Sequence, residues 1–360
     1  MGRQALRQSI GQVLMVGIPG PELDAATHVT LARFAVGGVI LFRRNVGDVG
    51  QLAALTAELH GLPSRPLVAI DHEGGRVLRV GAPLTAFPPM ATVGASGDAD
   101  LAQQVGRAMA RELRAVGVDL NFAPVLDVRS NPANPVIGDR AFGNDPAVVA
   151  NMGVAFMRGL QAGGVIACGK HFPGHGDTDT DSHLTLPVVR RERAALEQTE
   201  LVPFRAAIAA GIPLLMTAHV LYPALDVDRP ATLSRAILHD LLRVQLGFRG
   251  VIASDDLEMR AISDDRDIGR AAVETLAAGA DLLLMCADLA KAETAAEAIE
   301  RAVVDKQLDL AVLEAAADRV RDIERPVAEN PIAVTDLPVA AHVALNQRLR
   351  RRSFPFGDCR

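Results

Sequence analysis

The sequence predicts an α/β protein built as a single-domain (β/α)8 TIM-type barrel. Eight short apolar runs recur along the 360 residues, and each run ends in polar or glycine-rich residues. The strongest runs are continuous rather than alternating, which is typical of strands buried on both faces of a parallel sheet. Stretches with helical spacing separate the runs, and eight such repeats over about 300 residues match the count of this barrel.

The expected strands follow one another at intervals that leave room for a helix between most of them. In chain order they are Val13–Ile18, Gly38–Phe42, Leu67–Asp71, Leu120–Asp127, Val165–His171, Leu214–His219, Gly250–Asp255 and Asp281–Cys286. Apolar residues three and four apart predict helices that follow several of these strands. They are Leu101–Val116, Pro146–Gly159, Arg190–Ala210, Ser234–Gln245, Arg266–Ala278 and Leu289–Val303. An open, doubly wound sheet is the alternative, but the stretch GGRVLRVGAP lacks the G-x-G-x-x-G spacing of its usual phosphate loop.

No internal repeat or low-complexity linker divides the chain. Residues 1–325 are therefore expected to form one catalytic barrel. After about Glu324 the sequence becomes punctuated by proline. We expect residues 326–360 to form a C-terminal tail that is extended or partly disordered.

Composition narrows the possible partners. Apolar residues make up 49% and charged residues 22% of the chain, as in a globular protein with a large core. The net charge of −6 gives no basic footprint for nucleic acid or an anionic membrane. Three cysteines, no secretory leader and no membrane-spanning run favour the cytoplasm. Tryptophan is absent and Tyr222 is the single tyrosine, so a groove for a long polysaccharide is not expected, and no obligate protein partner is evident.

Ionisable residues follow the expected strands at equivalent places. They are Asp71, Asp127, Lys170–His171, His219 and Asp255–Asp256. The carboxyl ends of barrel strands meet at one face, where catalytic groups of such barrels lie. A charged group after a buried strand costs free energy unless it is paired or functional. These positions therefore predict an active site.

The stretch KHFPGHGDTDTDSH, residues 170–183, contains three histidines, three aspartates and a lysine. Two interpretations compete for it. His171, His175, Asp177, Asp181 and His183 are all potential metal ligands. Alternatively, Asp181 orients His183 and raises its basicity for acid–base catalysis. The residue types alone leave both interpretations open.

Five stretches together give the chain a family resemblance. They are IDHEGGRVLR (70–79), NFAPVLDV (121–128), DRAFG (139–143), KHFPGHGDTDTDSH (170–183) and SDDLEM (254–259). In this order they resemble the family 3 glycoside hydrolases, and within them the compact bacterial β-N-acetylhexosaminidases of cell-wall recycling. The resemblance covers roughly residues 10–325. It implies a retaining glycosidase that needs neither a metal nor an organic cofactor.

The resemblance also implies roles for single residues. Asp255 matches the nucleophile that forms a covalent glycosyl–enzyme intermediate. His183 matches the general acid/base, with Asp181 as its partner, in place of the usual second carboxylate. Because this pair lies on a loop, we expect a mobile loop in which Gly174 and Gly176 supply flexibility.

The remaining matches imply substrate contacts. Asp71 corresponds to a carboxylate that binds sugar hydroxyls, and Arg79, Arg140, Lys170 and His171 correspond to polar contacts around the sugar and its N-acetyl group. Outside these matches, Glu73, His219 and Asp256 are expected to support the site without touching substrate. Asp127 is as well suited to a hydrogen-bonding role at the barrel rim as to substrate contact, and Arg76 is expected in a surface ion pair.

The implied substrate is a muropeptide or another small N-acetylglucosamine (GlcNAc) compound. The enzyme would release GlcNAc from the non-reducing end of GlcNAc-1,6-anhydro-N-acetylmuramic acid, with or without a peptide. Three alternatives stay open: a metal-dependent hydrolase that uses the 171–183 cluster, a phosphorylase in which phosphate replaces water, and a sugar-binding protein without catalysis.

Overall fold

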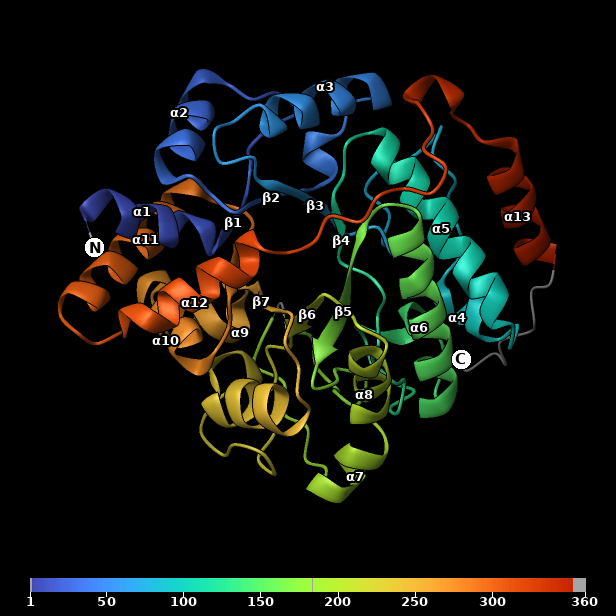
Figure 1. Cartoon of the computed structure of the whole chain (residues 1–360). Helices are drawn as coiled ribbons and strands as arrows, with labels where there is room; N and C mark the ends of the chain where they lie inside the picture. The colour runs from blue at the N-terminus through green and yellow to red at the C-terminus, as the bar shows by residue number, and fades with distance from the viewer. Residues whose placement is uncertain (1, 183, 352–360) are drawn as a thin grey trace.

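Eight parallel strands close into a barrel in a computed structural model that describes residues 2–182 and 184–351. This confirms the predicted (β/α)8 architecture (Figure 1). The strands pair in chain order, and β1 also pairs with β8. Their bounds are β1 Leu14–Gly17, β2 Gly38–Leu41, β3 Leu67–Ile70, β4 Leu120–Asn121, β5 Ile166–Phe172, β6 Leu214–Thr217, β7 Val251–Asp256 and β8 Leu282–Met285.

Helices surround the barrel (Figure 1). Their bounds are α1 Arg3–Gln12, α2 Ala25–Phe34, α3 Val49–His60, α4 Met90–Gly94, α5 Ala99–Ala115, α6 Pro146–Ala162, α7 Arg193–Gln198, α8 Leu201–Ala209, the π-helix η4 Ala236–Gln245, α9 Arg260–Ser263, α10 Ile268–Ala278, α11 Leu289–Val304, α12 Leu310–Arg321 and α13 Ala340–Arg351. None of the helices among the described residues is both long enough and apolar enough to cross a membrane.

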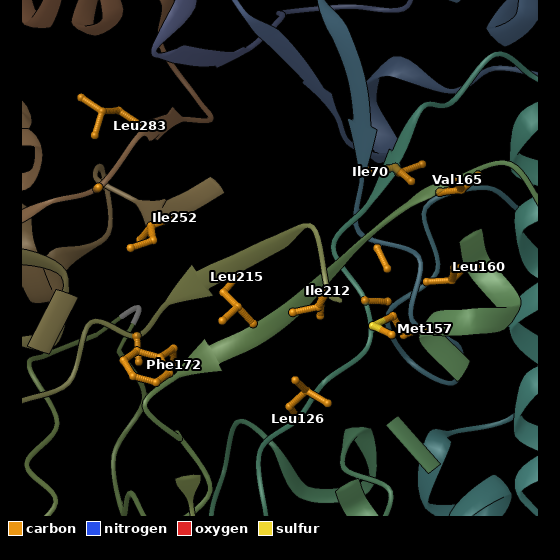
Figure 2. Packing of buried hydrophobic residues seen from close by; sticks show 14 of the residues in the cluster. Ile70, Leu126, Met157, Leu160, Val165, Phe172, Ile212, Leu215, Ile252 and Leu283 are labelled. Carbon is orange, nitrogen blue, oxygen red and sulfur yellow. The ribbon is translucent and has the colours of Figure 1, made fainter. Parts of the chain in front are cut away.

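The strands place alternate side chains on opposite sides of the sheet, as their period of two requires. One set fills the barrel interior and includes Met15, Ile40, Ala69, Cys168, Met216, Ala253 and Leu284. The other set packs against the helices: Ile70, Leu215, Ile252 and Leu283 belong to the same cluster as Met157 and Leu160 of α6 (Figure 2). Two residues beyond Ala69, Cys168 and Ala253 stand Asp71, Lys170 and Asp255. The same alternation therefore directs these three side chains toward the barrel axis, at its carboxyl end.

Two expected elements are shorter or interrupted. The expected strand Leu120–Asp127 keeps its ladder only over Leu120–Asn121. Pro124 has no N–H to donate, and the chain rejoins the sheet through a single bridge between Val125 and Lys170. The expected helix Arg190–Ala210 is divided into α7 and α8, and the buried side chain of Glu200 lies at the junction.

The C-terminal segment differs from the expected extended tail over part of its length. Helix α13 lies beside α5 (Figure 1). Its buried His342 Nδ1 lies 2.8 Å from Oε1 of Glu112 on α5. Prolines recur between residues 326 and 338 and are typical of an extended segment, so this helix was not predicted. Residues 352–360 lie outside the described part of the chain.

Candidate active site

A pocket of about 220 Å³ opens at the carboxyl end of the barrel. Its polar lining consists of Asp71, Glu73, Arg79, Arg140, Lys170, His171, His175, Ser182, Asp255 and Asp256. Its apolar lining consists of Ile40, Phe42, Val77, Val136, Met216, Met259, Leu284 and Cys286. The pocket lies at the face where barrels of this type hold their catalytic groups.

Two register shifts bring consecutive residues into the same pocket. The pairing of β5 with β6 shifts between Gly169 and Phe172, and the pairing of β7 with β8 shifts between Ala253 and Asp256. In a regular strand, neighbouring side chains point to opposite faces. An irregularity of this kind re-aims a side chain. As a result, Lys170 and His171 both line the pocket, and so do Asp255 and Asp256.

One wall of the pocket is a network of charges around the buried side chains of Lys170 and Glu73. Lys170 Nζ lies 2.7 Å from Oδ1 of Asp71 and 2.5 Å from Oε1 of Glu73. Arg140 holds Glu73 with two bonds of 2.8 Å, a bidentate arrangement. Burial alone would raise the pKa of Glu73, but Arg140 and Lys170 hold it well below its usual range. Arg79 completes the network at 3.4 Å from Oδ2 of Asp71.

Asp127 organises the histidines without lining the pocket. Its fully buried carboxylate accepts the backbone N–H groups of His171 and His175 at 3.1 and 2.7 Å. Asp127 Oδ2 lies 2.7 Å from Nδ1 of His171. This bond fixes the ring of His171, which lines the pocket. Asp127 is therefore a hydrogen-bonding residue at the rim, one of the two roles that its sequence position allowed.

Asp255 lies at the end of β7, among positive groups. Burial opposes its ionisation, but His219, His171 and Lys170 together hold the pKa of Asp255 below its ordinary value. The backbone N–H of Asp256 donates to Oδ1 of Asp255 at 2.8 Å. Buried His219 contributes a further contact, with Nε2 at 2.9 Å from the carbonyl oxygen of Asp256. The arrangement keeps an ionised carboxylate at the pocket wall.

The base of the loop that carries the expected acid/base pair is tightly packed. A Cβ atom on Gly176 would stand 1.7 Å from the carbonyl oxygen of Val128. A Cβ atom on Gly174, which has a φ of +135°, would press on the side chain of Glu200. The buried hydroxyl of Tyr222 donates to the carbonyl of Gly174. These glycines therefore permit close packing at the base of the loop, and the expected mobility of the loop stays a prediction.

His175 connects the first part of this loop to Ser182, near the end of the loop. Its ring is buried, and burial together with His171 lowers its pKa to about 4. Nδ1 lies 2.9 Å from Oγ1 of Thr178, and Nε2 lies 3.1 Å from Oγ of Ser182. The carbonyl of Ser182 accepts the N–H of Ala261 in α9, although the contact is long, at 3.3 Å. The loop is thereby connected to the segment that follows β7.

The structure brings together most of the expected site residues. Those that line the pocket are Asp71, Arg79, Arg140, Lys170, His171 and Asp255. Asp181 is described and half-buried but does not line the pocket, and His183 lies outside the described residues. Arg76 pairs with Asp139 at 3.5 Å on the surface, as expected. Where the chain is described, no three His, Cys, Asp or Glu side chains are arranged to hold a metal ion.

Comparison with known proteins identifies the family. Residues 5–323 match the glycosyl hydrolase family 3 N-terminal domain. The chain belongs to glycoside hydrolase family 3. A β-hexosaminidase of Nitrosomonas eutropha is 45% identical over 282 residues, which are 76% of this chain and 80% of that protein. These matches make the chain a family 3 glycosidase of the bacterial β-N-acetylhexosaminidase type, as its motifs predicted.

Solved structures agree with this assignment. A family 3 β-N-acetylglucosaminidase from Paenibacillus sp. has a TM-score of 0.92 at 40% identity, covering 97% of this chain and 68% of that one. NagZ from Neisseria gonorrhoeae, in complex with N-trifluoroacetyl-D-glucosamine, has a TM-score of 0.80 at 34% identity and covers 95% of this chain and 98% of its own. The same NagZ has also been solved in complex with zinc ion.

The pocket also contains residues that were not predicted to contact substrate. Glu73 and Asp256 were expected only to support the site, yet both line the pocket. Ser182 was not singled out at all. The signal for Ser182 was its position between two expected functional residues, Asp181 and His183. Its contact with His175 depends on how the loop folds back, which no local pattern encodes.

Proposed function

We propose that this enzyme releases GlcNAc from the non-reducing end of GlcNAc-1,6-anhydro-N-acetylmuramic acid, with or without a peptide, in peptidoglycan recycling. Such a recycling role implies action in the cytoplasm. The observation that carries the proposal is the placement of Asp255, an ionised carboxylate in a pocket of about 220 Å³. The pocket is smaller than typical sites for drug-sized ligands, which supports binding of one terminal sugar rather than a chain.

Asp255 has the properties of a nucleophile for a retaining reaction. Its carboxylate attacks the anomeric carbon while the bond from that carbon to the leaving oxygen breaks, and a covalent glycosyl–enzyme ester forms. Water then attacks the same carbon, the ester bond breaks, and GlcNAc leaves with its original β configuration. The lowered pKa keeps Asp255 charged at neutral pH, as the first step requires.

His183, with Asp181, is the proposed acid/base. It would donate a proton to the leaving oxygen in the first step and withdraw one from water in the second. The buried histidine closest to it in the motif, His175, is less suited to this role. Both of its ring nitrogens lie within hydrogen-bond distance of Thr178 and Ser182, and its pKa lies near 4.

Asp71, Arg79, Arg140, Lys170 and His171 are the proposed contacts to the sugar. The network around Lys170 supports this role because Lys170 and Glu73 are buried and the charged groups fix one another. Preorganised polar groups of this kind lose little entropy when a ligand binds. They can hold hydroxyl and acetamido groups without the aromatic platform that the sequence lacks.

His175 is poorly arranged as a metal ligand, because its two ring nitrogens contact Thr178 and Ser182. Among the described residues, no group of three His, Cys, Asp or Glu side chains is placed to hold a metal ion. We therefore propose a reaction that needs neither metal nor organic cofactor.

Product analysis tests the substrate and the reaction class together. GlcNAc-anhydromuramoyl-peptide is incubated with the enzyme, with and without inorganic phosphate, and the products are separated by mass. We expect free GlcNAc in both cases. GlcNAc-1-phosphate as the main product with phosphate would instead identify a phosphorylase, and uncleaved substrate would overturn the proposed substrate.

A further inference from the structure

Asp256 takes an unusual position directly after the proposed nucleophile. Asp256 follows Asp255 on β7. In a regular strand its side chain would therefore point away from the barrel axis. The register shift between β7 and β8 ends at Asp256, which pairs with Leu284, and the Asp256 side chain lines the pocket. Two adjacent carboxylates facing one site repel each other, so this arrangement costs free energy, and a function of the second carboxylate would explain that cost.

The two oxygens of Asp256 have different surroundings. Oδ1 accepts the backbone N–H groups of Glu258 and Cys286 at 3.1 and 3.2 Å. These bonds fix the carboxyl group between β7 and the end of β8. Oδ2 has no hydrogen-bond partner among the described residues, and it is not a buried atom. A carboxylate oxygen that is fixed in position, accessible and without a partner among the described residues can accept a hydrogen bond from a ligand.

We propose that Asp256 is a second substrate-binding carboxylate, which accepts a hydrogen bond from an O–H or N–H group of the sugar bound beside Asp255. This inference rests on the proposed function, because it takes the sugar to occupy this pocket. It adds to the pocket an acceptor from β7, whereas Asp71 follows β3.

A purely structural role does not account for both oxygens. Glu258, two residues further on, shows what such a role requires. Its Oε2 accepts the N–H groups of Ala287 and Asp288 at 2.6 and 3.3 Å, and its carboxylate pairs with Lys291. Glu258 joins the ends of β7 and β8 without lining the pocket. Asp256 joins the ends of β7 and β8 through Oδ1 alone, so this structural role does not involve Oδ2.

The charge of Asp256 fits an acceptor that works near neutral pH. Burial, Glu258 and Asp255 raise its pKa to about 6. The groups that face it are Asp255 on its own strand, Glu258 in the following turn and Cys286 after β8. His219, which follows β6, contacts its backbone carbonyl. Above pH 6 the carboxylate is ionised and is a strong acceptor.

Asp256→Asn tests the proposal with a nearly isosteric change. The amide oxygen still accepts the two backbone N–H groups, whereas the amide NH2 faces the pocket and cannot accept. Binding of GlcNAc is measured by calorimetry at pH 7.5, and KM and kcat are measured with an aryl N-acetylglucosaminide. We expect GlcNAc binding to weaken roughly tenfold or more, the effect of losing a hydrogen bond to a charged acceptor, and KM to rise more than kcat falls.

Glu258→Gln is the matched control, because it makes the same chemical change at a carboxylate outside the pocket. It should leave GlcNAc binding within twofold of wild type. GlcNAc binding by Asp256→Asn equal to that of Glu258→Gln would overturn the inference and leave the proposed function intact. A wild-type enzyme that fails to bind GlcNAc would overturn both.

A measurement on the wild type covers the case in which Asp256→Asn does not fold. GlcNAc binding is followed from pH 7.5 to pH 5 in the wild type and in Glu258→Gln. Protonation of Asp256 removes the charged acceptor, so binding by the wild type should weaken as the pH falls through about 6. In Glu258→Gln the same weakening should occur at a lower pH, because the charge of Glu258 helps to raise the pKa of Asp256. Binding that is flat across this range would contradict the proposal.

Discussion

The chemistry of single residues here depends on neighbours that are distant in sequence. Asp255 is ionised because His219, His171 and Lys170 outweigh its burial. Lys170 in turn is charged because Asp71 and Glu73 outweigh the effect of burial on its pKa. Strand-end positions in the sequence predicted Asp71, Lys170 and Asp255, since these positions follow from the period of a strand. The pairing of Glu73 with Lys170 could not be predicted, because it joins the segment after β3 to a residue of β5 that is distant in sequence.

The proposed acid/base is tested by His183→Ala. Natural disaccharides have poor leaving groups, so their turnover should fall by roughly 10²–10⁴-fold. An activated aryl leaving group needs little protonation, so the first step should be spared and the covalent intermediate should accumulate as a burst. Azide needs no base to attack, so it should restore part of the second step.

Asp181→Asn is the companion variant. The imidazole of His183 remains there, but its orientation and basicity weaken, so the loss should be milder than in His183→Ala. Burst amplitude and azide response are measured for both variants. An equal loss on aryl and natural substrates in His183→Ala, with neither burst nor rescue, would assign His183 a binding or structural role.

Metal independence is expected, since Thr178 and Ser182 contact both ring nitrogens of His175 and no three His, Cys, Asp or Glu side chains among the described residues are placed to hold a metal ion. Enzyme dialysed against EDTA should keep full activity, and elemental analysis should find no stoichiometric zinc. Activity that is lost on chelation and restored by Zn²⁺ would favour the metal-dependent alternative.

At the scale of elements, the strands were more predictable than the loops that make the site. Continuous apolar runs identify a strand buried on both faces, whereas the register shifts in β5 and β7 arise only when neighbouring strands pair. Helices α2 and α3 were not predicted from periodicity. Their signal was the N-cap, since Asp24 and Asp48 each accept a backbone N–H at the helix start.

The close packing at the base of the 170–183 loop allows a prediction about the effect of a glycine substitution on activity. Gly176→Ala places a methyl group against the carbonyl of Val128, so the loop must shift. A displacement near 1 Å of catalytic groups can cost about 100-fold, and we expect a loss of kcat/KM of this order. Gly81→Ala is the control, because a Cβ atom there meets nothing within 4 Å. Wild-type activity in Gly176→Ala would show that the loop base need not be rigid.

At the scale of the whole molecule, the C-terminal segment is joined to the barrel through α5 and the segment that follows β3. His342 of α13 contacts Glu112 of α5, and Glu112 accepts two hydrogen bonds of 2.7 Å from Thr85. Thr85 lies in the segment after β3 that also carries Glu73 and Arg79. The sequence allowed the barrel to be predicted as a whole because its pattern repeats. Helix α13 lies outside that repeated pattern of strands and helices, so the repeat could not be used to predict it.

Removal of the His342 side chain should therefore destabilise the fold. His342→Ala takes one partner from the buried carboxylate of Glu112, and such a loss costs about 1–3 kcal/mol. Urea unfolding measures the change. Arg348→Ala is the control, because Arg348 makes only an exposed contact to Gln104 and should change stability by less than about 0.5 kcal/mol. Equal stability of the two variants would show that α13 is not coupled to the barrel through Glu112.

The central claim is that Asp255 forms the covalent intermediate. A 5-fluoro analogue of an activated N-acetylglucosaminide slows both steps, so that the intermediate can be trapped, digested and sequenced by mass spectrometry. The account predicts one sugar per chain, attached to the peptide that contains Asp255, and no label in Asp255→Ala. Label on another carboxylate, or rapid turnover by Asp255→Ala, would contradict it.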